Sequence, residues 1–168
     1  MSAEKGPDRE PKGLSEARVR KASSRDAATV GRLLYDFNRE FETPTPTAEQ
    51  FATRFEALIE RDDVSVLLSE SHAEALGFAF LTMRPTPYGD GPLVQLEELY
   101  VEPRCRNRGV GTTLLHAALA EASARDAVEM HINVDEDDVA TRRFYERYGF
   151  VNLQPGGEFR MLCYLREL

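Results

Sequence analysis

The stretch that decides the fold reads Leu99-Tyr-Val-Glu-Pro-Arg-Cys-Arg-Asn-Arg-Gly-Val-Gly-Thr112. Residues 96–101 predict a central strand, and Pro103 removes the backbone donor that would extend it. From Val110 onward, leucine and alanine recur at helical spacing, which predicts a helix that begins at about Gly109. The sequence therefore runs from a strand, through a basic glycine loop, into an amphipathic helix.

The start of this predicted helix suits an anion. Its first backbone N–H groups have no intrahelical partner, and no Ser, Thr, Asp or Asn clearly caps them. The helix dipole favours negative charge at this end, and Gly109 and Gly111 let phosphate oxygens approach the backbone closely. Arg104, Arg106 and Arg108 add positive charge. We expect a pyrophosphate site here.

Other glycine motifs fit this loop less well. A P-loop requires Gly-Lys-Ser/Thr, which does not occur in the chain, and a Rossmann fingerprint requires a third glycine where Leu114 stands. The pattern R-x-x-G-x-G over residues 106–111, preceded by V-x-P over residues 101–103, resembles the acetyl-CoA signature of the GNAT N-acetyltransferase superfamily. From this motif alone, an ordinary strand-to-helix loop remains the alternative.

A second segment carries the same resemblance. Residues 128–134 alternate like a half-buried strand, and the acidic residues 135–138 predict the start of a helix. That helix ends in Arg143-Phe-Tyr-Glu-Arg-Tyr-Gly-Phe150, which resembles the family's F-Y-E-x-x-G-F segment. The resemblance covers about Arg18 to Leu168 and includes a last strand at Cys163–Leu168.

The resemblance implies an α/β (α+β) fold, the GNAT acyl-CoA N-acyltransferase fold, in which about four helices flank a mixed, splayed β-sheet. The predicted elements follow the order β-α-α-β-β-β-α-β-α-β-β, which is the order of the GNAT fold, and an antiparallel hairpin is predicted around Ser71–Glu74. The remaining elements are predicted strands over 19–22, 64–68 and 75–83 and helices from Ser24 to Phe37 and from Thr47 to Ile59.

Composition narrows the class of protein. A length of 168 residues fits one domain, and we expect a disordered tail at 1–14 followed by a single GNAT domain at 15–168. Lys plus Arg number 21 against 29 Asp plus Glu, and this net charge of −8 argues against nucleic acid as a partner. Two cysteines and three scattered histidines predict no metal site. No run of 18 apolar residues occurs, so we expect no membrane partner and a cytoplasmic location.

Two glutamates on the predicted central strand are candidate bases. On strict alternation, Glu98 shares a face with Leu96 and Tyr100, whereas Glu97 shares the other with Leu99. A carboxylate among apolar neighbours tends to have a raised pKa, so Glu98 is the preferred base toward an amine. A β-bulge in this strand would exchange the two faces, and an ion pair with an arginine would make Glu98 structural instead.

The resemblance implies the other roles. Tyr145 matches the family's tyrosine that protonates the leaving thiolate, and an aromatic side chain that only packs is the alternative. Asp138 stands where the family often has an Asn that contacts pantetheine, and it also suits a helix N-cap. A backbone N–H near Leu99–Val101 would meet the oxyanion. The residues expected at the cofactor are Leu99, Tyr100, Val101, Arg106, Asn107, Arg108, Gly109, Val110, Gly111, Thr112 and Asp138.

The function that these features imply is transfer of an acetyl group from acetyl-CoA to an amine by direct attack in a ternary complex. By the same resemblance, the acceptor site would lie at Asp36–Glu42 and Thr82–Tyr88. Its carboxylates suit a cationic small molecule such as an aminoglycoside or polyamine, or a peptide amine, and an ordinary solvated helix face is the alternative for them. A non-catalytic acetyl-CoA sensor or interaction module, and a different nucleotide-binding enzyme, are the alternatives. Members of the family commonly form homodimers, but no stretch of this sequence specifies such an interface.

Overall fold

The computed structural model describes residues 17–42, 44–153 and 156–166, and it divides into two compact units that meet in the sequence at His131 and Ile132. Each unit is described by itself. The tail predicted at residues 1–14 lies outside the described residues. Of the described helices, none is long and apolar enough to cross a membrane.

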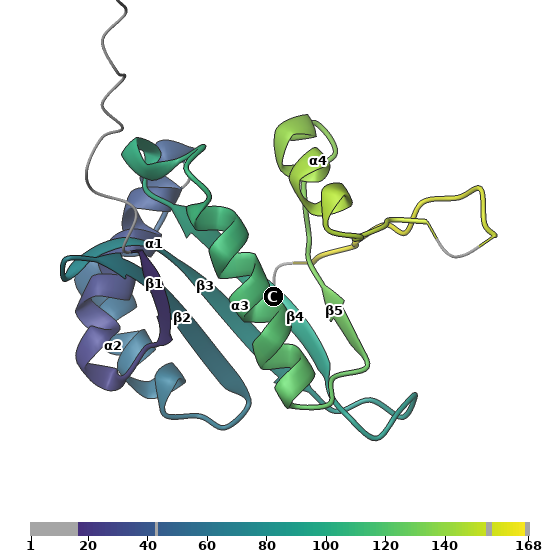
Figure 1. Cartoon of the computed structure of the whole chain (residues 1–168), viewed down its shortest axis with the longest axis horizontal. Coiled ribbons are helices and arrows are strands. Elements are labelled where there is room, and N and C mark those ends of the chain that lie inside the picture. The colour runs from purple at the N-terminus through teal and green to yellow at the C-terminus, as the bar shows by residue number, and fades with distance from the viewer. Residues whose placement is uncertain (1–16, 43, 154–155, 167–168) are drawn as a thin grey trace, which may run out of the picture. The chain divides into compact units, whose positions relative to one another are not determined.

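The first unit contains a mixed sheet, as the family resemblance implies, and this sheet has five strands (Figure 1). Its strands lie in chain order and pair antiparallel, except that the last pair is parallel. The hairpin predicted around Ser71–Glu74 is confirmed. The strands are β1 Arg18–Lys21, β2 Val64–Ser71, β3 Glu74–Arg84, β4 Leu93–Val101 and β5 Glu129–His131.

Helices cover both faces of this sheet. α1 (Ala27–Glu40) and α2 (Ala48–Ile59) pack together on one face, and α3 (Val110–Ala124) crosses β3 and β4 on the other (Figure 1). Two short 3₁₀ turns, Ser24–Asp26 and Pro103–Cys105, precede α1 and α3. The predicted start of α2 is confirmed, because the Thr47 hydroxyl accepts from the Gln50 N–H.

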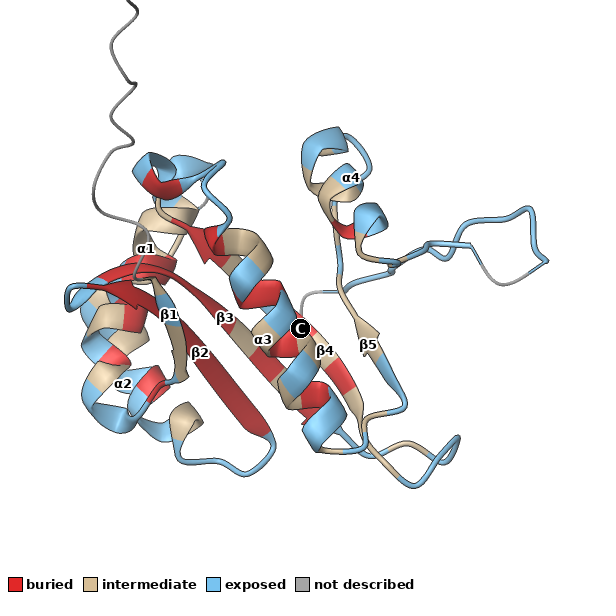
Figure 2. Ribbon diagram, viewed as in Figure 1, coloured by how far each residue is buried: buried red, intermediate tan, exposed pale blue. Residues whose placement is uncertain are grey.

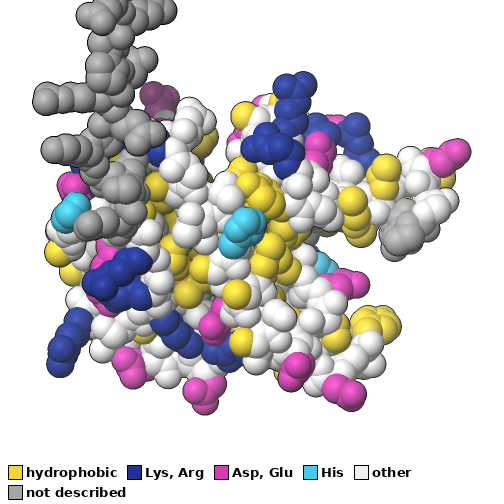
Figure 3. Space-filling view, in the orientation of Figure 1, with side chains coloured by type: hydrophobic (Ala, Val, Ile, Leu, Met, Phe, Trp, Pro, Cys, Tyr) yellow, Lys and Arg dark blue, Asp and Glu magenta, His cyan; other side chains and the backbone are white. Residues whose placement is uncertain are grey.

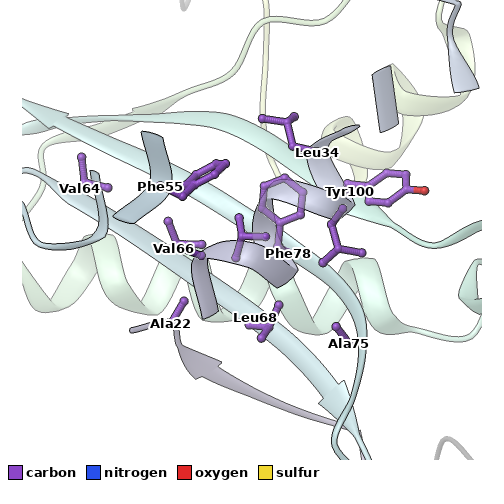
Figure 4. Close-up of a cluster of buried hydrophobic side chains, with 12 residues drawn as sticks. Ala22, Leu34, Phe55, Val64, Val66, Leu68, Ala75, Phe78 and Tyr100 are labelled. Carbon is purple, nitrogen blue, oxygen red and sulfur yellow. The ribbon is translucent and has the colours of Figure 1, made fainter. Parts of the chain in front are cut away.

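The core explains why these layers hold together. Every residue of β2 is buried, since helices cover both of its faces (Figure 2). Toward α1 and α2, the rings of Phe55 and Phe78 lie edge to face with their centroids 6.4 Å apart. Tyr100 lies at the edge of this cluster, and its hydroxyl points away from Phe78 (Figure 4). The core therefore ends at the strand that carries the candidate site.

One extra residue interrupts the pairing of β3 with β4. Phe80 lies opposite Glu98, but the next residue, Leu81, lies opposite Leu96. Glu97 is thus the bulged residue, and the alternation of β4 changes phase there.

The sheet opens beyond Gln95. β5 pairs with β4 over Leu93–Gln95 only, so residues 96–101 of β4 have no described strand neighbour on that side. This opening is the splay that the family resemblance implies. It leaves the backbone of residues 96–101 available at one edge of the first unit.

The second unit contains α4 (Val139–Arg147), which Asp138 caps by accepting from the Thr141 N–H at 3.0 Å. An isolated bridge joins Leu153 to Arg160. The strand predicted at Cys163–Leu168 is wrong for the described residues 163–166, which have no regular structure. A strand requires backbone partners as well as an apolar sequence, and no described segment pairs with this one.

Gly31 tests how α1 and α2 are packed. A Cβ at Gly31 would lie 2.6 Å from the Ala52 nitrogen and 2.8 Å from the Ala48 oxygen of α2. Helix propensity alone favours Gly31→Ala by about 1 kcal/mol, but separating two backbones costs roughly 1–3 kcal/mol. We expect net destabilisation in denaturant unfolding. Ala28→Gly, at an exposed position of α1, measures propensity alone; a Gly31→Ala protein more stable than the wild type would contradict this packing.

Candidate functional site

The loop between β4 and α3 has the backbone of a phosphate cradle. Asn107 and Gly109 are both left-handed, with φ of 58° and 84°. Nothing lies within 4 Å of where a Cβ on Gly109 would be, so backbone conformation rather than space favours glycine there, and the loop faces open room. Cys105 is buried beneath the loop, consistent with a small packing residue.

The N-terminus of α3 presents backbone N–H donors to the open space beside Gly109. Its N-cap is Gly109, which has no side chain to satisfy them. The Thr113 N–H donates to the Gly109 carbonyl at 2.9 Å, so the N–H groups of Val110 and Gly111 precede the first intrahelical hydrogen bond. These donors, aligned with the helix dipole, suit an anion.

The three arginines of the loop do not act alike, which corrects the expectation that all three add free positive charge. Arg104 pairs with Glu74 and Glu102, and Arg106 pairs with Glu40. Within the described part of the chain, the exposed Arg108 makes no ion pair. Acidic and basic side chains are likewise interspersed on the face shown in Figure 3. Arg108 is therefore the arginine whose charge remains for a ligand.

The open edge of β4 offers backbone groups in a fixed pattern. The Glu102 N–H donates to the Leu76 carbonyl of β3 at 2.9 Å. Because successive residues of a strand point their backbone groups to opposite sides, Leu99 and Val101 direct theirs away from β3. Arg106 Nε confirms this direction, since it donates to the Val101 carbonyl at 3.0 Å. The predicted oxyanion donors therefore lie at the open edge.

The bulge places both candidate bases on the same face of the sheet, which corrects the expected alternation. Glu98 lies opposite Phe80 and shares the α1–α2 face with it and with Tyr100. Glu97 accepts from the Thr82 hydroxyl at 2.5 Å, so its carboxylate lies on that face too. Leu96 turns to the α3 face, opposite Leu81. The bulge thus brings the two glutamates to the same face of the sheet instead of exchanging their faces.

Burial and charge both act on Glu98. Loss of solvent around the partly buried side chain, and then the negative charge of Glu97, raise the pKa of Glu98 to about 7. In the described residues, no arginine or lysine pairs with Glu98 or Glu97. The ion-paired alternative for Glu98 is therefore wrong, and its carboxyl can exchange a proton near neutral pH.

Asp138 and Tyr145 belong to the second unit. The N-cap role of Asp138 is confirmed, and its hydrogen bonds to Thr141 hold its pKa below the usual range. Tyr145 is buried, and its ring lies edge to face with Phe144 and Phe150, with centroids 5.1 and 5.4 Å apart. Packing is thus one role of Tyr145, and the cofactor roles of both residues stay predictions.

The carboxylates predicted for the acceptor site are partly engaged elsewhere. Asp36 pairs with Arg32 at 2.7 Å, and Glu40 pairs with Arg106. No local pattern predicts the pairing of Glu40 with Arg106, because the two residues are 66 positions apart. By contrast, the ion pair of Arg32 with Asp36 can be predicted from the sequence, because residues four apart are neighbours on the surface of a helix.

Comparison with known proteins gives one consistent result. A family model described as "Acetyltransferase (GNAT) family" matches residues 31–150. A solved structure from Arthrobacter sp. FB24, described as an acetyltransferase, is 42% identical with a TM-score of 0.83, covering 90% of this chain and 96% of that one. The uncharacterized N-acetyltransferase YhfO of Bacillus subtilis (strain 168) is 26% identical over 132 residues, 79% of this chain and 88% of its own. The aminoglycoside acetyltransferase meta-AAC0020, from an uncultured soil metagenomic sample, is alike in fold, with a TM-score of 0.75 at 17% identity over 92% of this chain and 99% of its own.

The closeness of the two glutamates predicts how a substitution of Glu97 changes the pKa of Glu98. Glu97→Gln removes one negative charge beside Glu98, so the pKa of Glu98 should fall. Most of the elevation should remain, because burial is its larger cause. A ¹³C NMR titration of the glutamate carboxyl groups measures this pKa. Glu129→Gln, which removes a carboxylate from β5, should leave it unchanged; the same pKa in Glu97→Gln and wild type would show that the two carboxylates do not interact.

Proposed function

The chain belongs to the acetyltransferase (GNAT) family, and on that premise we propose that it transfers the acetyl group of acetyl-CoA to an amine by direct attack in a ternary complex. The observation that carries the proposal is the arrangement along β4. A carboxyl with a pKa of about 7, an open backbone edge and an anion-binding helix start follow one another within residues 98–111.

The cofactor end of the site fits the anionic part of CoA. Open room at Gly109, the donors of Val110 and Gly111, and the charge of Arg108 suit a pyrophosphate. When bound, acetyl-CoA supplies a thioester whose carbonyl carbon accepts a nucleophile. In this proposal the N–H groups of Leu99 and Val101, at the open edge, hold the acetyl oxygen as negative charge develops on it.

Glu98 is the proposed base. An amine with a pKa near 10.4 is mostly protonated at neutral pH and must lose a proton before it attacks. A carboxyl with a pKa of about 7 is half ionised at that pH and accepts this proton more readily than an ordinary glutamate. By the family resemblance, Tyr145 is the proposed acid toward the departing thiolate, a role beyond the packing described above.

The acceptor is proposed to be a cation. Asp36 and Glu40 pair with arginines, so the proposal assigns the acidic groups that face the acceptor to Glu97 and Glu98. Their shared face is bordered by the aromatic side chains of Phe80 and Tyr100, which also favour a cation. A cationic small molecule such as an aminoglycoside or a polyamine, or a peptide amine, has this chemistry; the aminoglycoside acetyltransferase of like fold is one precedent for the first class.

Binding of the cofactor is the first test. Acetyl-CoA at a hundred times its Kd should raise the Tm by roughly 5–10 °C, because a ligand of the native state stabilises it by mass action. Gly111→Asp should abolish the shift, since a carboxylate would occupy the place of the pyrophosphate, while an acidic residue in the first turn of a helix leaves the fold intact. Differential scanning fluorimetry measures both proteins.

The matched control is Ala120→Asp, which adds the same charge at an exposed position in the later turns of α3. It should keep the full shift. An unchanged Tm of the wild-type protein in millimolar acetyl-CoA would contradict the proposed cofactor, and a shift retained by Gly111→Asp would place the cofactor elsewhere.

Glu98→Gln tests the base. Thiol release from acetyl-CoA, measured with a panel of amines, should fall by about a hundredfold at pH 7 and recover partly above pH 9, where the amine deprotonates unaided. Wild-type turnover should rise as the pH passes about 7, because Glu98 must be ionised to act. A Glu98→Gln protein with the wild-type pH profile would remove Glu98 from the mechanism, and binding without thiol release from any amine would favour a non-catalytic acetyl-CoA-binding protein.

A stability measurement accompanies this test. Because folding raises the pKa of Glu98 from 4.5 to about 7, the folded state loses stability as the pH rises through that window. Glu98→Gln removes this loss, so it should stabilise the protein by about 1–3 kcal/mol at pH 8 and much less at pH 4. Lower activity together with higher stability at pH 8 would separate a lost base from a damaged fold.

A further inference from the structure

An ion pair joins the end of α1 to the phosphate loop. Glu40, the last residue of α1, receives two hydrogen bonds from the guanidinium of Arg106, at 2.5 and 2.7 Å. The two side chains are 30% and 39% exposed, so water screens the pair only in part. The pair connects two segments that are 66 residues apart in the sequence.

Arg106 is held from further directions. Its Nε donates to the Val101 carbonyl at 3.0 Å, and its guanidinium carbon lies 5.8 Å from the centre of the Tyr100 ring. The guanidinium therefore bridges α1, the open edge of β4 and the loop. This engagement leaves Arg106 poorly suited to meet a phosphate, whereas the exposed Arg108 remains suited to it.

The position of Glu40 also points to a role for the pair. A carboxylate in the last turn of a helix is repelled by the negative end of the helix dipole. Arg106 offsets this repulsion, because the charge of Glu40 is neutralised where the helix ends. Neighbouring Tyr100 and Phe37 pack against each other with ring centroids 5.3 Å apart, which fixes the end of α1 over the same stretch of β4.

Resting on the proposed function, we propose that Glu40 is a positioning residue of the acetyl-CoA site. Through Arg106 it holds the loop and the Val101 carbonyl in the conformation that the cofactor requires. Arg108 and the backbone donors of α3 then meet the phosphates, and Arg106 does not. Arg106, the first arginine of the R-x-x-G-x-G pattern, thus connects α1 to the end of β4 in this chain.

The sign of one substitution tests this proposal. Removing a negative charge near a polyanion site should tighten acetyl-CoA binding if charge alone matters. If Glu40 positions the loop, Glu40→Gln should instead weaken binding by about tenfold and raise the KM for acetyl-CoA with little change in kcat. The matched control is Glu74→Gln, which removes a carboxylate from Arg104 while Arg104 keeps Glu102. This control should not weaken binding.

Salt dependence separates the two arginines. Calorimetric titration with acetyl-CoA at several salt concentrations should show that Arg106→Gln weakens binding but lowers the slope of log Kd against log salt less than Arg108→Gln does. Thermal unfolding without ligand confirms that each variant is folded. Tighter binding in Glu40→Gln, or a slope lowered in Arg106→Gln as much as in Arg108→Gln, would overturn the proposal. Absence of acetyl-CoA binding by the wild-type protein would instead overturn the proposed function.

Discussion

The extra residue in β4 is the constraint on which the candidate site depends. Without it, strict alternation would send Glu97 and Glu98 to opposite faces of the sheet. With it, both carboxylates reach the α1–α2 face, while Leu96 still turns to the core beneath α3. One inserted residue therefore places two carboxyl groups on one face of the strand. The apolar residues on the other face keep their positions. The raised pKa of Glu98 follows from its burial and, to a lesser extent, from the neighbouring charge of Glu97.

The same strand serves the other parts of the proposed chemistry. Its short pairing with β5 leaves Leu99 and Val101 at an open edge, and its end leads directly into the loop that starts α3. The proposed base and backbone donors thus lie on one rigid strand, which β3 and β5 flank and which α1 and α3 contact, and the proposed anion site directly follows it. Sites built on such elements are held more accurately than sites on free loops. The bridge from Glu40 to Arg106 extends this rigidity to the loop itself.

Local patterns predicted most of the fold. Apolar periodicity located the hairpin of β2 and β3 and the helices, and the caps Thr47 and Asp138 act where the sequence predicts them. The family resemblance predicts a last strand at Cys163–Leu168, but the described residues 163–166 are not a strand, because strand formation depends on a partner that a local motif does not specify. Periodicity likewise locates β4 without revealing a bulge, because a bulge is a property of the pair of strands. The charge of the loop was misjudged for a related reason: arginines close in sequence have their acidic partners on distant elements.

A crystal structure of the protein with acetyl-CoA tests the central claim most directly. The account predicts the pyrophosphate against the N–H groups of Val110 and Gly111. It also predicts the thioester oxygen within hydrogen-bond distance of the Leu99 or Val101 N–H, with the acetyl carbon accessible from the face that carries Glu98. A thioester bound away from the open edge of β4, or separated by the sheet from Glu98, would contradict it.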